Sequence, residues 1–172
     1  MIYFIRHGES EANEKGVLAR DNVHLTKKGR MQVEEAAGEI LKENIKFDHI
    51  IVSPLTRTKE TAIIIVDKIG FDQKKIEYDK RIAEYEVGEM ADKPEKGTTS
   101  AKLISTKGAE DPYKFKDRIK SFLNQYKNSK KNILMVSHAG VGRMIGVINK
   151  HQNPKIFYDL PKWPNATLIK LK

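Results

Sequence analysis

The chain alternates short apolar segments with longer segments of helical periodicity, and this alternation restricts its fold more than any other feature. Strand-like segments occur at Ile2–Ile5, His49–Val52, Ile76–Tyr78, Ile133–Ser137 and Ala166–Leu171. Strands that alternate with helices are typical of an α/β domain with a mostly parallel sheet. We therefore predict a three-layer α/β fold, with helices on both faces of a mostly parallel central sheet. The length of 172 residues fits a single domain spanning residues 1–172.

The sequence predicts four helices, the first three through capping signals. The starting points are Thr26, Ser53-Pro54, Asp111-Pro112 and about Gly140. Ser, Thr and Asp accept hydrogen bonds from the free N–H groups of a first helical turn, and proline suits the first helical position. We expect the second of these helices to run towards Ile69 and the fourth to Asn149. Residues 92–110 are polar and lack a firm periodicity, so we expect them to form a surface excursion or a lid.

The composition excludes several classes of protein. Hydrophobic residues make up 39% and charged residues 32%, a globular balance rather than a disordered or membrane-spanning one. The absence of cysteine excludes disulfide scaffolds, thiol catalysis and thiolate metal sites, and it fits a reducing compartment. The first residues lack the basic lead and apolar core of a secretion signal. We therefore expect a cytoplasmic protein that does not associate with membranes.

The charge is strongly positive. Lys and Arg number 32 against 23 Asp and Glu, which gives a formal net charge of +9. Such a surplus indicates an anionic partner, either a nucleic acid or a phosphorylated metabolite. The lysines are scattered along the chain, which favours a solvated basic surface over a nucleic-acid footprint. We expect a small phosphorylated partner and no nucleic acid.

Three polar segments directly follow predicted strands. They are Arg6–Ser10, Ser53–Arg57 and Ser137–Gly140. Ligands of open α/β sheets bind at the carboxyl ends of the strands, so we expect the three segments to meet at one rim. That rim would hold two histidines, two arginines and at least one helix N-terminus, which attracts anions.

Taken singly, each of these residues has an ordinary explanation. A lone histidine at a strand end is more often structural than catalytic, and a lone arginine more often forms a surface ion pair. Arg57 is more informative, because the macrodipole disfavours a cation in a first helical turn and a bound anion would compensate. The convergence of four such groups favours a phosphate site.

The segment from Phe4 to Asn13, Phe-Ile-Arg-His-Gly-Glu-Ser-Glu-Ala-Asn, resembles the signature of the histidine phosphatase superfamily, also called phosphoglycerate-mutase-like. Further elements resemble that family in the family's order: Leu25–Gln32, Ser53–Thr61, Val136–Gly140 and Pro164–Ala166. Together they cover the chain from residue 2 to about residue 170.

The resemblance implies a mechanism without a cofactor or a metal. His7 would be the nucleophile and form a phosphohistidine, with its other ring nitrogen held by the carbonyl of Gly8. Arg6 and Arg57 would bind the phosphoryl oxygens, which planar guanidinium groups suit better than lysine does. His138 would stabilise the charge of the transferring group. Asn13 would add a neutral donor at the rim.

The resemblance also implies a general acid for the leaving alkoxide. The family's acid is a glutamate four residues before a glycine, and Glu84 precedes Gly88 at that spacing. The surrounding residues depart from the family's usual continuation, and Glu86 and Glu89 are nearby rivals. Family mutases are longer and carry an arginine and a tyrosine where Tyr85 and Val87 stand here. We therefore expect a phosphatase that hydrolyses a phosphomonoester. Family members of similar size act on a sugar phosphate, on α-ribazole phosphate or on a protein phosphohistidine, so the resemblance leaves the substrate open.

Four other functions are alternatives to this interpretation of the sequence. Mutase-type phosphoryl transfer is the runner-up, and a non-catalytic module that senses phosphate would use the same pocket. The spacing of Gly140, Gly142 and Gly146 misses a dinucleotide-binding turn by one residue. A metallohydrolase would need histidines and carboxylates at ligand spacing, and no such motif occurs.

Overall fold

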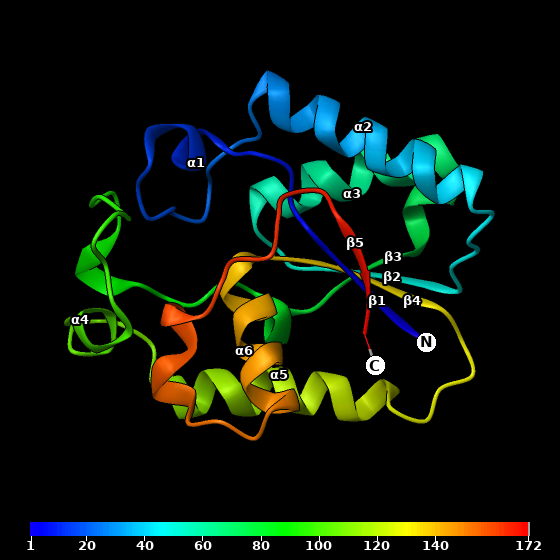
Figure 1. The fold of residues 1–172 in the computed structure, drawn as a ribbon. Coiled ribbons are helices and arrows are strands. Elements are labelled where there is room, and N and C mark those ends of the chain that lie inside the picture. The colour runs from blue at the N-terminus through cyan, green and yellow to red at the C-terminus, as the bar shows by residue number, and fades with distance from the viewer. Residues whose placement is uncertain (172) are drawn as a thin grey trace.

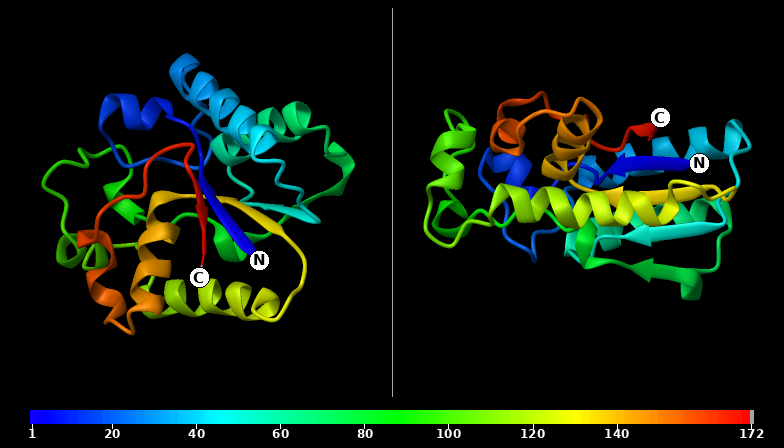
Figure 2. Two further views of the ribbon diagram at one scale, coloured as in Figure 1. Left: turned by 45° about the vertical axis from the view of Figure 1, so that its right-hand side comes forward. Right: turned by 90° about the horizontal axis from the view of Figure 1, so that it is seen from below.

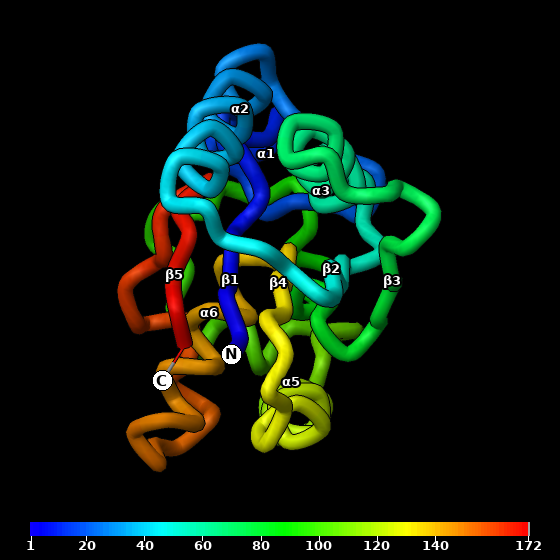
Figure 3. Tube along the Cα trace, turned by 90° about the vertical axis from the view of Figure 1, so that its right-hand side faces the viewer, coloured from blue at the N-terminus to red at the C-terminus, as the bar shows by residue number. Residues whose placement is uncertain are grey.

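The computed structural model describes residues 1–171 and shows a mixed α/β fold around a five-stranded sheet. The strands are β1 (Ile2–Arg6), β2 (His49–Val52), β3 (Ile76–Tyr78), β4 (Ile133–Ser137) and β5 (Leu168–Lys170). Their order across the sheet is β3-β2-β4-β1-β5, which the view along the sheet in Figure 3 shows from one edge to the other. β5 runs antiparallel to β1, and the other neighbours are parallel. The predicted fold class is confirmed.

Helices cover both faces of the sheet (Figures 1 and 2). The α-helices are α1 (Glu11–Lys15), α2 (Lys27–Lys42), α3 (Thr56–Ile69), α4 (Ser100–Ile104), α5 (Pro112–Tyr126) and α6 (Ala139–Asn149). Short 3-10 helices lie at Gln73–Lys75, Lys80–Ile82, Gly88–Met90 and Pro154–Asp159. α2 and α3 pack on one face, and α5 and α6 pack on the other (Figure 3).

Two apolar cores lie on opposite faces of the sheet, and alternation along each strand divides the side chains between them. Ile5 of β1 packs in the core under α2 and α3, whereas Phe4 packs in the core under α5 and α6. Every residue of β4 is buried, which explains its uninterrupted apolar sequence. In the described chain, no helix combines the length and the apolar character that a membrane span requires.

Three of the four predicted helix starts are confirmed, among them that of α6, which begins at Ala139 beside the expected Gly140, and one is wrong. Thr26 caps α2 by accepting from the N–H of Gly29, and Asp111 caps α5 with Pro112 in the first turn. Ser53 does not cap α3, which begins at Thr56 after Leu55. The Ser53 hydroxyl lies 2.7 Å from Nε2 of His138 instead. A tertiary partner has therefore taken the hydroxyl that the local pattern assigned to a cap.

The excursion at residues 92–110 contains a helix that periodicity did not reveal. α4 has a single turn capped by Thr99, and it buries Leu103. Figure 1 shows this segment at the carboxyl ends of the parallel strands, opposite the two chain termini. The excursion therefore lies on the side of the sheet where a ligand is expected.

We predict that Gly29→Ala destabilises the fold by about 1–3 kcal/mol, because a Cβ there would overlap the backbone of Glu9. Gly38→Ala is the matched control on the same helix, since open space surrounds its Cβ position. Replacing glycine by alanine in a helix interior should stabilise by about 0.5–1 kcal/mol. Urea denaturation of the two variants measures both changes. Equal stabilities would contradict the close approach of α2 to the loop after β1.

Candidate active site

The register of the sheet brings His7 and His138 together. Arg6 pairs with Ser137 across β1 and β4, so the two histidines that follow leave adjacent parallel strands side by side. The backbone N–H of His7 donates to the carbonyl of Ser137 at 3.0 Å. The two imidazole rings lie 5.3 Å apart, centroid to centroid, at an angle of 61°. The predicted convergence of these segments is confirmed.

His7 is held with one ring nitrogen available. Its Nδ1 lies 2.7 Å from the carbonyl oxygen of Gly8, which only accepts, so Nδ1 carries the proton. The lone pair of the neutral ring is therefore on Nε2, to which Nε of Arg57 donates at 3.3 Å. Burial and the neighbouring Arg57 hold the pKa of His7 well below its usual value. The ring is thus neutral at physiological pH, with its lone pair in the pocket that His7 lines.

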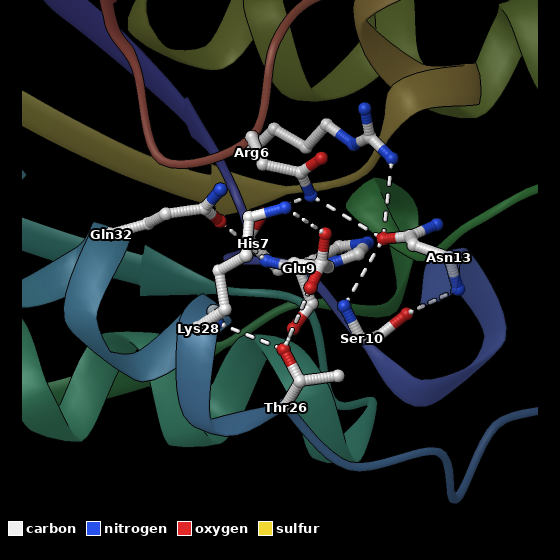
Figure 4. A network of polar contacts seen from close by, with 10 residues as sticks. Arg6, His7, Glu9, Ser10, Asn13, Thr26, Lys28 and Gln32 are labelled. Carbon is white, nitrogen blue, oxygen red and sulfur yellow. Dashed lines mark hydrogen bonds and ion pairs between the residues drawn. The ribbon is translucent and has the colours of Figure 1, made fainter. Parts of the chain in front are cut away.

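Arg6 and Asn13 line this pocket, and Figure 4 shows the contact between their side chains. Nη1 of Arg6 donates to the carbonyl of Trp163 at 3.0 Å, and Nη2 lies 3.5 Å from Oδ1 of Asn13. Asn13 belongs to the first turn of α1, where its side chain and that of Ser10 form a capping box. Nδ2 of Asn165 donates to the carbonyl of His7 at 2.8 Å. Asn165, in the segment that leads to β5, therefore anchors the backbone of His7.

The loop after β1 is anchored on α2 through Glu9 (Figure 4). The Glu9 backbone N–H donates to Oε1 of Gln32 at 2.9 Å, and its carbonyl accepts from the backbone N–H of Thr26 at 2.9 Å. The Glu9 carboxylate accepts from the Thr26 hydroxyl at 3.0 Å and from Nζ of Lys28 at 2.8 Å. These contacts give a structural reason for the family element Leu25–Gln32, which positions the loop that carries His7.

Arg57 is a buried cation in the first turn of α3. Its side chain is 1% exposed, and Nη1 donates to the carbonyl of Arg20 at 2.8 Å. Burial lowers the pKa of Arg57 and of Arg6 below the usual value, although the nearby Glu84 opposes the shift in both. Neither arginine forms an ion pair within residues 1–171. Two desolvated guanidinium groups beside one pocket favour an anion there.

His138 directly precedes α6 and is fully buried next to His7. Its Nε2 interacts with the hydroxyl of Ser53, while its Nδ1 has no hydrogen-bond partner within the described protein. Nε of Arg6 likewise has no hydrogen-bond partner within the described protein. Burial and the neighbouring Arg57 hold the pKa of His138 well below its usual value. Unsatisfied buried nitrogen atoms are rare, and both of these belong to residues of the predicted site.

Glu84 lines the same pocket as His7, Arg6 and Arg57. Its Oε1 accepts from the N–H of Tyr85 at 3.0 Å, and its Oε2 accepts from the N–H of Gly140 at 3.2 Å. Glu86 and Glu89 are exposed, and Glu89 pairs with Lys107 at 3.9 Å. Of the three candidate carboxylates, Glu84 therefore lines the pocket of His7, whereas Glu86 lines a neighbouring depression.

Arg118 of α5 holds the segment that carries Glu84, and the sequence pattern did not reveal it. Its guanidinium donates to the carbonyls of Arg81, Ala83 and Glu84 at 2.7, 2.8 and 3.0 Å. The same group forms two hydrogen bonds to the carboxylate of Glu110, at 2.7 and 2.9 Å. A single side chain thus fixes the backbone on both sides of Ala83. In the sequence, nothing distinguishes Arg118 from the other cationic residues of a basic helix.

Other residues of the pocket also escaped the sequence analysis. They come from the loop after α1, the excursion, α6 and the segment after it, and include Val17, Leu18, Glu95, Leu103, Arg143, Phe157, Tyr158 and Lys162. None belongs to a recognisable motif, because their proximity arises from the packing of distant segments. Within residues 1–171, no three side chains of His, Cys, Asp or Glu gather as a metal site would require.

Comparison with known proteins identifies the family. The model of the histidine phosphatase superfamily (branch 1) matches residues 2–172, so the chain belongs to that superfamily. A protein of Hydrogenobacter thermophilus named "Putative phosphoserine phosphatase 2" is 33% identical over 153 residues, covering 81% of this chain and 73% of that protein. The 2,3-bisphosphoglycerate-dependent phosphoglycerate mutase of Thermoplasma acidophilum is 41% identical over 86 residues, covering 49% of this chain and 40% of that protein.

Solved structures share the fold at low sequence identity. YhfR of Bacillus stearothermophilus matches with a TM-score of 0.81 and 19% identity, over 99% of this chain and 91% of that one. A mycobacterial glucosyl-3-phosphoglycerate phosphatase matches with a TM-score of 0.79 and 17% identity, over 97% and 88% of the two chains. These likenesses support the architecture of the sheet and its helices.

The buried histidines predict a dependence of stability on pH. Because the pKa values of His7 and His138 are lowered in the folded state, only the unfolded chain binds protons there as the pH falls below about 6.5. We predict that the free energy of unfolding decreases from pH 7.5 to pH 5.5, by at most about 1.4 kcal/mol per pH unit for each histidine. Urea denaturation at several pH values measures the slope.

The variant His138→Gln should lose part of this slope, because one of the two groups no longer titrates. His151→Asn is the matched control, since His151 is exposed and lies outside the pocket. A slope that is the same in His138→Gln and in the parent protein would show that the buried pair is not its source.

Proposed function

We propose that the protein is a phosphatase that hydrolyses the phosphomonoester of a small metabolite through a phosphohistidine at His7, without a metal. The observation that carries the proposal is the bond from Nδ1 of His7 to the Gly8 carbonyl, which leaves the lone pair on Nε2. Nε2 belongs to a pocket that Arg6 and Arg57 make cationic. The names of the related phosphatases and mutases support phosphoryl transfer as the chemistry.

The first step transfers the phosphoryl group to His7. Arg57 releases Nε2 and turns its donors to the phosphoryl oxygens, which compete as charged acceptors. Nε2 then forms a bond to phosphorus as the bond to the ester oxygen breaks. The Glu84 carboxyl group gives its proton to that oxygen, so the alcohol leaves neutral.

The second step regenerates the enzyme. Water attacks phosphorus, the P–N bond breaks, and the Glu84 carboxylate takes up the proton of the water. Inorganic phosphate leaves, and His7 returns to its neutral form. In both steps Arg6, Arg57 and His138 stabilise the charge on the phosphoryl oxygens, and Asn13 adds a neutral donor at the rim. Nε of Arg6 is an unpartnered donor that a phosphoryl oxygen would satisfy, and Nδ1 of His138 is a second one in the tautomer in which Nε2 accepts from the Ser53 hydroxyl.

The surroundings of Glu84 favour hydrolysis over mutase chemistry. The family's mutases carry an arginine and a tyrosine at the positions of Tyr85 and Val87. Here the Tyr85 ring packs against Phe115 and Phe157, and its hydroxyl donates to the carbonyl of Glu110. Val87 bridges Ala109. Neither position supplies the cation that would retain a phosphorylated intermediate during reorientation.

We predict that His7→Ala lowers kcat/KM for p-nitrophenyl phosphate by about three orders of magnitude or more, because the nucleophile is lost. Rapid acid-free quenching with ³²P-labelled substrate should trap a base-stable, acid-labile phosphoenzyme in the parent protein only. His151→Asn is the control for a histidine substitution outside the pocket. Full activity in His7→Ala would refute the proposal.

We predict that Glu84→Gln lowers kcat/KM about 100-fold for an alkyl phosphate and much less for p-nitrophenyl phosphate, whose leaving group needs little protonation. Arg118→Gln should show the same selective loss to a smaller degree, because Arg118 positions the Glu84 segment. In the double variant, removal of Arg118 should add little to the loss from Glu84→Gln.

The matched control is Arg30→Gln, which removes an arginine paired with Glu60 on the protein surface. A purely structural role for Arg118 would lower the activity on both esters equally, and its effect would add to that of Glu84→Gln. That result would show that Arg118 does not act through proton transfer by Glu84.

A further inference from the structure

The hydroxyl of Ser53 forms its hydrogen bond with the second histidine of the site. Ser53 directly follows β2, and both Ser53 and His138 are fully buried. Its Oγ lies 2.7 Å from Nε2 of His138, and within residues 1–171 this is the one hydrogen-bond partner of the hydroxyl. The helix α3 begins just beyond and has no side-chain cap, although serine is among the best capping residues. The folded chain therefore uses this hydroxyl for the imidazole.

The backbone on either side of this hydroxyl is fixed. The N–H of Ser53 donates to the carbonyl of Val136 in β4 at 3.0 Å, and the carbonyl of Ser53 accepts from the hydroxyl of Thr58 at 2.9 Å. A serine has one side-chain torsion between its backbone and its oxygen, and that torsion has three staggered positions. Ser53 therefore presents its hydroxyl from the end of a rigid strand, as a group that orients another side chain must.

His138 carries a single ring proton. Burial and the neighbouring Arg57 hold the pKa of His138 well below its usual value, so its ring is neutral at physiological pH. A charged imidazole donates through both nitrogen atoms, whereas a neutral one has one donor and one acceptor. In a neutral ring, the partner of one nitrogen decides what the other nitrogen presents. The contact with Ser53 therefore determines the character of Nδ1.

The count of satisfied groups favours one tautomer of His138. Its Nδ1 has no hydrogen-bond partner within the described protein. With the proton on Nε2, the Ser53 hydroxyl would accept, and both the hydroxyl proton and the lone pair of Nδ1 would be left unpaired. With the proton on Nδ1, the Ser53 hydroxyl donates to Nε2, and the Nδ1–H group alone is left unpaired. Buried polar groups without partners are costly, so the second arrangement is the more stable.

We propose that Ser53 is a positioning residue, which donates to Nε2 of His138 and so fixes the proton on Nδ1 as a hydrogen-bond donor to the transferring phosphoryl group. The inference rests on the proposed phosphatase function and deepens the role of His138 in it. The two histidines are then complementary. The Gly8 carbonyl makes His7 present a lone pair, and the Ser53 hydroxyl makes His138 present an N–H group. In the other tautomer, the lone pair of Nδ1 would repel a phosphoryl oxygen instead of stabilising its charge.

Nuclear magnetic resonance measures the tautomer without turnover. In protein labelled with ¹⁵N-histidine, two-bond ¹H–¹⁵N correlation spectra show which nitrogen of each ring carries the proton, and the signals lost in His138→Asn belong to His138. We expect a protonated Nδ1 and an unprotonated Nε2 for His138 in the parent protein. In Ser53→Ala the donor to Nε2 is lost, so the population protonated on Nε2 should rise.

Ser137→Ala is the matched control for this measurement. The Ser137 hydroxyl is equally buried at the end of the neighbouring strand, but it donates to the carbonyl of Ile82 at 2.8 Å. Its removal costs a buried hydrogen bond without changing the partner of Nε2. We therefore expect the tautomer of His138 to be the same in Ser137→Ala as in the parent protein.

Substitutions of His138 test which nitrogen acts in the reaction. Asparagine places an amide N–H near the position of Nδ1, and glutamine places one near Nε2. With p-nitrophenyl phosphate, we expect kcat/KM to be about tenfold higher in His138→Asn than in His138→Gln, and about tenfold lower in Ser53→Ala than in the parent protein. In the His138→Asn background, Ser53→Ala should change kcat/KM by less than about twofold, because an amide has no tautomer to select.

Three results would overturn the inference. They are a proton on Nε2 of His138 in the parent protein, a tautomer that persists in Ser53→Ala, and an equal loss of activity from Ser53→Ala in the parent and His138→Asn backgrounds. The last result would make Ser53 purely structural. Thermal denaturation checks that each variant folds, and the spectrum of the parent protein decides the tautomer if Ser53→Ala does not fold. Failure to trap a phosphohistidine, with the expected tautomer present, would refute the proposed mechanism alone.

Discussion

The parallel pairing of β1 with β4 is the constraint on which the rest of the site depends. Adjacent parallel strands lie about 4.8 Å apart, so residues at the same register leave the sheet side by side. Arg6 opposite Ser137 therefore sets the separation of the His7 and His138 rings at 5.3 Å. A shift of one residue in either strand would turn one histidine towards the opposite face of the sheet. A shift would also exchange the side chains of both strands between the two cores, to which they are individually fitted.

Burial and charge then determine the different roles of the arginines and the histidines in the pocket. The buried guanidinium groups of Arg6, Arg57 and Arg143 make it a place for anions, and the same burial keeps both histidines neutral. In the proposed mechanism neutral His7 attacks phosphorus, so the charge proposed to bind the substrate also preserves the nucleophile. The carbonyl of Gly8 completes the arrangement by fixing the tautomer.

Local signals predicted the elements well where no distant residue competed for them. Thr26 and Asp111 cap their helices as their neighbours indicate. Ser53 carries an equally good signal, yet its hydroxyl interacts with His138, and α3 begins later. Neither Arg118 nor α4 could be predicted from periodicity, because one is a single arginine and the other a single helical turn. Their roles follow only from the carbonyls and side chains that they contact.

The sequence alone determined the alternation of strands and helices, the order of the family's elements, and the placement of His7, Arg57 and His138 just after strands, because these depend on near neighbours along the chain. Three relations come from the packing of the folded chain: which carboxylate lines the pocket of His7, which arginine holds the segment of that carboxylate, and the presence of Arg143 and Arg6 in one pocket. Those relations join residues that are far apart in sequence. They arise from the packing of helices and loops against the sheet, which local pattern does not encode.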